Sequence, residues 1–203
     1  MDILITGGAG FIGSHLSDSL NELGHNVVLC DLPGRFSDFQ IEKYNTIECD
    51  VSDMSQVDSL LPLVDVIYHL AAQVGTASSL RNISLDLKWN ALGTLNITQF
   101  AQRIACKKLI YASTMAVYGH ANCASETWPI NPWSPYGISK ACGERYLKYI
   151  QIKCPEMNCI IFRIFNCYGP GQSTKNLTQG LASIFLEQVK NGNTIEVTGS
   201  LER

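Results

Sequence analysis

A tyrosine and a lysine four residues apart, in the segment Tyr136-Gly-Ile-Ser-Lys140, form the pair in this sequence best suited to move a proton. Four residues make about one helical turn, so both side chains lie on one face of a helix. A lysine ammonium beside a phenol favours the phenolate, and we expect it to lower the phenol pKa from about 10. We therefore predict that Tyr136 acts as a base near neutral pH.

A second pair with the same spacing, Tyr149 and Lys153, lies 13 residues further along the same predicted helix. At about 100° per residue this is roughly 220° around the helix, so the two pairs cannot address one site. Tyr136 is preferred because it opens the helix directly after the loop Trp133-Ser-Pro135. Tyr149 is expected to be an ordinary surface residue.

A hydroxyl group ends the predicted strand that precedes this loop. The strand reads Tyr111-Ala-Ser-Thr114 at its end, and the carboxyl ends of parallel strands are where ligands bind in such sheets. Thr114 is predicted to hydrogen-bond a substrate hydroxyl and to help relay its proton. The alternative is that Ser113 and Thr114 merely end the strand.

Three glycines follow the first predicted strand with a three-residue spacing, at Gly7, Gly10 and Gly13. Gly7 permits a tight turn, Gly10 lets the backbone approach a pyrophosphate, and Gly13 allows close packing of helix on strand. The N–H groups at the helix start, including those of Phe11 and Ile12, would meet the diphosphate. Ordinary turn glycines are the competing explanation.

Acidic residues end the second and third predicted strands. Asp31 can accept hydrogen bonds from both ribose hydroxyls and would repel a 2′-phosphate, which favours NAD over NADP. Asp31 could instead be a turn residue before Pro33-Gly34, and the nearby Arg35 leaves NADP open. Asp50 and Val51 could hold the adenine edge, or Asp50 could cap a helix.

Strands and helices alternate in the order expected of βαβ units. A doubly wound parallel sheet of the α/β class, a Rossmann fold, is therefore predicted. The predicted strands are Asp2–Thr6, Asn26–Asp31, Thr46–Asp50, Val64–Leu70, Lys108–Ser113, Asn158–Phe165 and Thr194–Val197. The predicted helices are Phe11–Leu23, Met54–Leu61, Ile83–Ile104, Pro135–Ile152 and Leu177–Val189.

Composition narrows the class of protein. Hydrophobic residues make up 46% of the 203 residues, and the net charge of −3 comes without a basic stripe, so nucleic acid is not expected as a partner. The eight cysteines form no CxxC pair, so we expect reduced core thiols and no metal site.

A strand that begins almost at Met1 leaves no room for a signal peptide, and no apolar run is long enough for a membrane. We therefore expect a cytoplasmic protein.

Six motifs in order carry a family likeness. They are TGGAGFIG (6–13), HLAAQ (69–73), NALGTLN (90–96), STMAVYG (113–119), SPYGISK (134–140) and RIFNCYGPGQ (163–172). Together they resemble the extended short-chain dehydrogenase/reductases, the NAD-dependent epimerase/dehydratase family that includes UDP-glucose 4-epimerase. The likeness covers nearly the whole chain.

This resemblance implies the roles of further residues. Thr114, Tyr136 and Lys140 match the family's catalytic set, and the last two also contact the cofactor. Residues 70–72 (Leu70, Ala71 and Ala72) match the segment that lines NAD, and Asn90 matches a residue near the catalytic lysine. The expected substrate contacts are Gln73, Ser79, Thr114 and Asn166. A homodimer through the two longest helices is implied as well.

Two departures from the family pattern refine the expected reaction. Met115 and Ala116 stand where sugar 4,6-dehydratases carry an Asp-Glu pair, which favours epimerisation over dehydration. Family members continue for about a hundred residues beyond Arg203, so we expect residues 1–203 to be the NAD-binding domain, with most of the substrate subdomain missing. The predicted activity is nucleotide-sugar epimerisation, most readily of a UDP-sugar. A decarboxylase, dehydratase or reductase of the same family and a non-catalytic NAD-binding fragment remain the alternatives.

Overall fold

The computed structural model describes residues 1–60, 63–121, 123–173 and 180–195. Within these ranges, six strands form one parallel sheet in the order β3-β2-β1-β4-β5-β6. They are β1 (Asp2–Thr6), β2 (Asn26–Asp31), β3 (Asn45–Glu48), β4 (Val66–His69), β5 (Lys108–Thr114) and β6 (Asn158–Ile164). This order, with its reversal between β1 and β4, confirms the predicted doubly wound fold.

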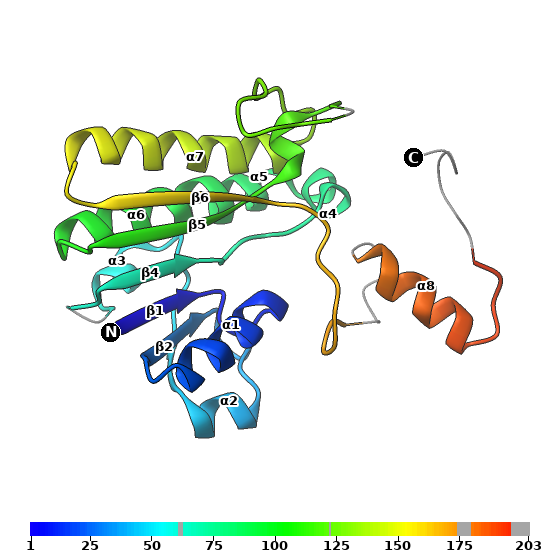
Figure 1. The fold of residues 1–203 in the computed structure, drawn as a ribbon, viewed down its shortest axis with the longest axis horizontal. Helices are drawn as coiled ribbons and strands as arrows, with labels where there is room; N and C mark the ends of the chain where they lie inside the picture. The colour runs from blue at the N-terminus through cyan, green and yellow to red at the C-terminus, as the bar shows by residue number, and fades with distance from the viewer. Residues whose placement is uncertain (61–62, 122, 174–179, 196–203) are drawn as a thin grey trace. The chain divides into compact units, whose positions relative to one another are not determined.

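Helices pack on both faces of the sheet, the arrangement typical of parallel sheets. On one face, α3 (Met54–Asp58), α6 (Gly93–Arg103) and α7 (Pro135–Lys153) pack over buried residues such as Leu4, Ile67 and Leu109. On the other face, α1 (Phe11–Glu22) packs over β1 and β2, whose Ile3 and Ile5 are buried there. Figure 1 shows α6 and α7 on the side of the sheet opposite α1.

The predicted helix Ile83–Ile104 is one helical run with three different parts. It comprises α5 (Ile83–Asp86), a π-helical stretch η1 (Leu87–Leu92) and α6. A π turn carries one extra residue, so it changes which side chains face the neighbouring helix α7. Asn90 and Ala91 of η1 are buried.

Three short helices were not predicted. They are α2 (Asp38–Lys43), α4 (Thr76–Arg81) and the 3₁₀ turn η2 (Met115–Tyr118). Ser37 and Gln40 form a capping box at the start of α2, a signal that the sequence contained. At the C-terminal side, α8 runs over Leu181–Lys190, so the part of its predicted range before residue 180 lies outside the described residues. Thr194 and Ile195 form no strand, and residues 196–197 of that predicted strand are not described.

Contacts divide the chain into two compact units, residues 1–165 and 166–203. The first unit contains the whole sheet.

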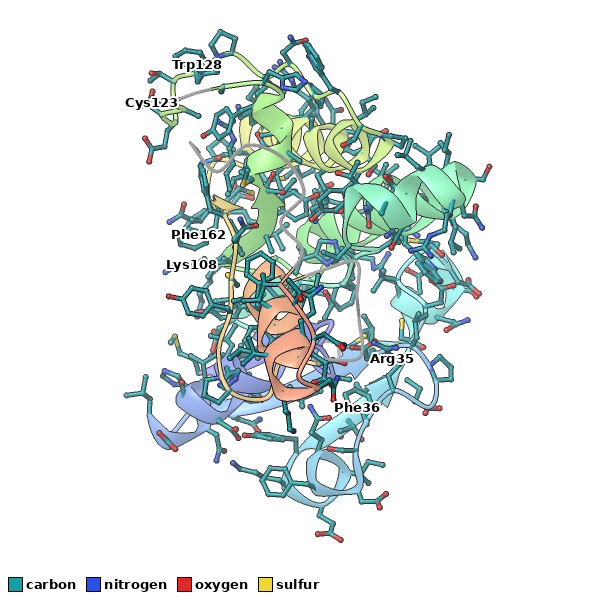
Figure 2. The ribbon with its side chains drawn as sticks, turned by 90° about the vertical axis from the view of Figure 1, so that its right-hand side faces the viewer. Arg35, Phe36, Lys108, Cys123, Trp128 and Phe162 are labelled. Carbon is teal, nitrogen blue, oxygen red and sulfur yellow. The ribbon has the colours of Figure 1, made fainter. Side chains whose placement is uncertain are left out.

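Among the described residues, no helix is both long and apolar enough to cross a membrane. The cysteines form no disulfide in the structure, and Cys30, Cys49, Cys106 and Cys154 are buried. Cys123 and Cys167 are exposed, so the prediction of core thiols is wrong for these two. Cys123 lies with Trp128 on the loop after η2 (Figure 2).

Candidate functional site

The glycine loop makes a turn that no other residue type could make. Gly7 has a φ of 74°, and a Cβ placed on it would lie 2.7 Å from the Ala71 nitrogen and 2.8 Å from the Leu70 carbonyl carbon. A Cβ on Gly13 would overlap the Gly7 carbonyl oxygen. The backbone of residues 70–71, after β4, therefore packs directly on the loop, although the two segments lie far apart in sequence.

The start of α1 offers hydrogen-bond donors to an anion. Its N-cap is Gly10, which has no side chain to occupy the first-turn N–H groups. The N–H groups of Phe11 and Ile12 lie at the positive end of this 12-residue helix. Because a side chain at Gly7 or Gly13 would fill the turn in front of them, this cradle fits a dinucleotide diphosphate.

Asp31 lies beside the same loop at the carboxyl end of β2. Its carboxylate accepts hydrogen bonds from the backbone N–H of Ala9 (3.0 Å) and of Leu32 (2.8 Å). These bonds fix the carboxylate at the edge of the cradle, which agrees with the predicted ribose contact. Arg35 follows on the loop that leads to α2, next to Phe36 (Figure 2).

Asp50 and Val51, predicted near the adenine, take part in local structure. The Asp50 carboxylate accepts hydrogen bonds from the Ser52 hydroxyl (2.6 Å) and from Lys88 (3.3 Å). Burial alone would raise the pKa of Asp50, but these bonds together lower it. Val51 is buried and its carbonyl accepts from Asn96 (3.0 Å). The α3 cap is Asp53, not Asp50, and the adenine contact stays a prediction.

Asn90 organises the segment after β4. Its side chain is fully buried, accepts from the Gln73 N–H (2.8 Å) and donates to the Gln73 carbonyl (3.0 Å). The Oε1 atom of Gln73 is buried and has no hydrogen-bond partner, which suits a donor from a ligand. Ser79 is fully buried and donates to the Thr76 carbonyl (2.8 Å). Its predicted sugar contact stays untested.

Thr114 and Tyr136 meet at the carboxyl edge of the sheet. The Thr114 oxygen accepts a hydrogen bond from the Ala116 N–H (3.2 Å), and the Thr114 hydroxyl lies close enough to the Tyr136 phenol to lower its pKa. Ser134 caps α7 by accepting from the Gly137 N–H (3.1 Å), which places Tyr136 in the first turn. The structure therefore brings the predicted hydroxyl and phenol together.

The predicted direction of the phenol pKa is wrong for the chain without ligand. Burial raises the pKa of Tyr136, the hydrogen bond from Thr114 lowers it, and the charge of Asp86 raises it, so the net effect is upward. A fully charged Lys140 beside the phenol would lower the phenol pKa, but Lys140 is itself buried, with 1% exposure. Burial lowers the pKa of Lys140 to about 7, so its charge is only partly present at neutral pH.

A buried polar network under the site was not predicted. The Thr94 hydroxyl donates to the Asn90 carbonyl (2.5 Å), so its oxygen accepts from Nε2–H of His69 (3.0 Å). Nδ1 of His69 then accepts from the Thr6 hydroxyl (2.7 Å). Burial lowers the pKa of His69 to about 3, so the ring is neutral. The network ties β1, β4 and η1 together.

Four charged or polar residues near Tyr136 and Lys140 were also not predicted. They are Asp86, Ser139, Glu144 and Arg163, all buried or half-buried. Asp86 accepts from Ser139 (2.5 Å), and Glu144 accepts from both Nε (2.9 Å) and Nη2 (2.8 Å) of Arg163. The position of Glu144 could have been predicted from its spacing, because Tyr136, Lys140 and Glu144 recur every four residues.

Other predicted or candidate sites lie elsewhere. Tyr149 is 59% exposed, in line with its predicted surface position. Asn166 is exposed and belongs to the second unit, so its predicted sugar contact stays untested. A cleft of about 530 Å³, lined by residues such as Tyr118, Lys148 and Phe162, includes no predicted site residue. In the described part of the chain, no group of three or more His, Cys, Asp or Glu residues is arranged to hold a metal.

Comparisons with known proteins agree with this geometry. Residues 3–203 match the model of the NAD dependent epimerase/dehydratase family. The chain is 37% identical over 199 residues to a putative UDP-glucose 4-epimerase of Methanocaldococcus jannaschii, covering 95% of this chain and 65% of that protein. It is 35% identical to UDP-glucuronic acid decarboxylase 1 of Xenopus tropicalis, covering 99% of this chain and 49% of that protein.

Solved structures show the same fold. The crystal structure of Thermus thermophilus UDP-glucose 4-epimerase in complex with NAD matches with a TM-score of 0.88 at 33% identity, over 96% of this chain and 64% of that one. The chain thus spans about two thirds or less of the length of these relatives. The sheet order, the glycine cradle and the match over residues 3–203 establish that this chain belongs to the NAD-dependent epimerase/dehydratase family.

Proposed function

We propose that the protein interconverts nucleotide sugars, most readily UDP-sugars, by NAD-dependent epimerisation through a transient 4-keto sugar. The observation that carries this proposal is the position of the Thr114 hydroxyl beside the phenol of Tyr136, one helical turn before the buried Lys140. A hydroxyl and a phenol in this arrangement can hold a substrate hydroxyl and take its proton. Relatives named as UDP-glucose 4-epimerases support the choice of substrate class.

NAD is the cofactor of this family, and the residues that would hold it are distributed along the carboxyl edge of the sheet. The glycine cradle would bind the diphosphate and Asp31 would bind the ribose, and residues 70–72 would line both groups. Asp50, Val51, Asn90, Tyr136 and Lys140 are proposed to complete the site. When bound, oxidised NAD supplies a reversible hydride acceptor and a positively charged ring.

The chain's own residues would handle the proton. Tyr136 removes it from the sugar C4 hydroxyl while Thr114 holds that hydroxyl in place. A positive charge close to the phenol favours the phenolate, and Lys140 provides one in its protonated form. After the keto sugar turns in the pocket, hydride would return to the other face of C4 and Tyr136 would return the proton to the C4 oxygen, which inverts the configuration at C4. Gln73, Ser79 and Asn166 are proposed to contact the substrate.

Epimerisation is preferred over dehydration because of the two residues that follow Thr114. Met115 is apolar and 41% exposed, and Ala116 carries no functional group, so neither can expel water from a sugar ring.

Decarboxylation is the second candidate, since the chain aligns over 99% of its length with a UDP-glucuronic acid decarboxylase. Incubating the full-length protein with UDP-glucose, UDP-N-acetylglucosamine and UDP-glucuronate, followed by product analysis, distinguishes the two reactions.

Tyr136→Phe is the direct test of the proposed base. In the full-length protein we expect kcat to fall by about three orders of magnitude or more, because the proton acceptor is lost. Tyr149→Phe, which alters the exposed tyrosine of the second Tyr-x-x-x-Lys pair, should leave kcat unchanged. Near-normal turnover by Tyr136→Phe would exclude this role.

The cytoplasmic location and the homodimer are further proposals. Exposed apolar side chains on the two longest helical runs support a dimer, namely Ile83, Leu87, Leu92, Ile138 and Ile152. Covering such side chains is a common reason for helix-to-helix dimerisation. Light scattering on the full-length protein measures the oligomeric state directly.

A further inference from the structure

The short helix α2 buries a polar side chain and leaves its large apolar side chains in solvent. All six of its residues are described, and among them Gln40 is the buried one, at 7% exposure. Phe39 and Ile41 on either side of it are 60% and 56% exposed. A buried amide is costly unless its N–H and C=O groups are hydrogen-bonded. The partners of Gln40 therefore show what this helix is packed against.

The two ends of the Gln40 amide bind different parts of the chain. Its Oε1 accepts from the N–H and from the hydroxyl of Ser37 (both 3.2 Å), which completes the capping box of α2. Its Nε2 donates to the carbonyl oxygen of Gly8 (3.0 Å), in the loop after β1. A backbone N–H can only donate and a carbonyl oxygen can only accept, so these partners determine which end of the amide is which.

The peptide group between Gly8 and Ala9 is held on both sides. Its carbonyl accepts from Gln40, and its N–H donates to Oδ2 of Asp31 (3.0 Å). Because a peptide group is planar, a rotation that frees the carbonyl also withdraws the N–H from Asp31. Gly10, the N-cap of α1, follows directly. The Gln40 side chain therefore stabilises the conformation of the loop that carries the glycine cradle.

We propose that Gln40 is a positioning residue for the dinucleotide site. By holding the Gly8–Ala9 peptide, it keeps Asp31 and the start of α1 in the arrangement that NAD would meet. The inference rests on the proposed binding of the NAD diphosphate by the glycine cradle. In this role Gln40 acts through the loop and not on the cofactor. The apparent affinity for NAD then falls with the fraction of molecules in which the loop is correctly placed.

Three variants of the 203-residue chain separate this role from helix capping. Gln40→Glu, as a carboxylate, keeps an oxygen for the capping box but has no N–H for Gly8. Gln40→Met has a similar length, adds no charge and loses both contacts. Ser37→Ala loses the hydroxyl of the capping box but keeps the bond from Gln40 to Gly8.

Calorimetry with NAD should give a Kd about 3- to 10-fold higher for Gln40→Glu and for Gln40→Met, the effect expected of one neutral hydrogen bond. Ser37→Ala should leave the Kd close to that of the unaltered chain. Without NAD, hydrogen exchange of the Ala9 N–H should be faster in both Gln40 variants and unchanged in Ser37→Ala. Helix capping alone would not produce this difference between the variants.

An unchanged Kd in the Gln40 variants, while the unaltered chain binds NAD, would refute the role of Gln40 alone. An equal increase in Ser37→Ala would assign the effect to helix capping and would also overturn the proposal. If the unaltered chain did not bind NAD, the proposed cradle itself would be wrong, and the role of Gln40 would be refuted with it.

A measurement on the unaltered chain covers the case in which the Gln40 variants do not fold. If the bond from Gln40 to Gly8 favours NAD binding, then NAD must favour that bond to the same extent. Saturating NAD should therefore slow the hydrogen exchange of the Gln40 side-chain amide. An exchange rate that NAD leaves unchanged would overturn the proposal.

Discussion

The Asp31 carboxylate is held at the edge of the glycine cradle by two backbone N–H groups, and a side-chain amide could keep only part of that arrangement. Asp31→Asn should therefore weaken NAD binding about 10- to 100-fold, since a charge-assisted hydrogen bond to the ribose contributes roughly 1.5–3 kcal/mol. Calorimetry with NAD measures this. Asp38→Asn, at an exposed position of α2, is the matched control and should leave the affinity unchanged. Equal affinities of the two variants would contradict the ribose contact.

His69 gives the protein a stability that depends on pH. Its folded-state pKa of about 3 lies below the ordinary value of 6.5, because the ring is buried between Thr6 and Thr94. As the pH falls below 6.5, the imidazole of His69 is therefore protonated in the unfolded chain but stays neutral in the folded chain. The stabilisation is complete above pH 6.5 and is progressively lost down to pH 3.

We expect the free energy of unfolding to fall by about 1.5 kcal/mol from His69 alone between pH 6.5 and pH 5. Denaturant titrations at several pH values measure it. His25→Gln removes a different histidine and should retain the dependence of the unfolding free energy on pH. Loss of that dependence in His25→Gln would show that the effect does not come from His69. The carboxylate of Glu144 adds a separate loss at lower pH, since Arg163 lowers its pKa.

Helix α7 depends on a glycine at its contact with strand β5. A Cβ at Gly143 would overlap the Tyr111 hydroxyl and lie 3.2 Å from Cγ2 of Thr94. Gly143→Ala should therefore destabilise the fold by about 1–3 kcal/mol, even though alanine is the better helix former. Thermal unfolding measures the change. Tyr149→Ala, on the exposed side of the same helix, should stay within about 0.5 kcal/mol.

The elements were more predictable than the environment of the site. Alternating apolar and polar runs, with glycine and acidic residues at strand ends, predicted every strand of the sheet to within two residues. The π turn at Leu87–Leu92 could not be predicted, because helix periodicity does not reveal one extra residue. The pairing of Asp86 with Ser139 depends on how that turn meets α7, so the altered pKa values of Tyr136 and Lys140 were also missed.

The carboxyl edge of the first unit, residues 1–165, contains a complete set of predicted cofactor groups. NAD at about 100 times its Kd should therefore stabilise the 203-residue chain by about 2.7 kcal/mol and raise its Tm by roughly 5–10 °C. NADP should give a smaller increase, because Asp31 repels the 2′-phosphate. Scanning fluorimetry with both nucleotides measures this, and an equal shift with NADP would show that Arg35 accommodates the phosphate.

Strand β6 is an edge strand of the sheet within the described residues. In the described residues, only β5 hydrogen-bonds to it, and Phe162 on it is 55% exposed (Figure 2). A strand with an open side and an apolar ring is a template for strands of other molecules. We therefore expect molecules of the 203-residue chain to associate edge to edge through β6 in concentrated samples. A short peptide that pairs with the open edge of β6 should prevent this association.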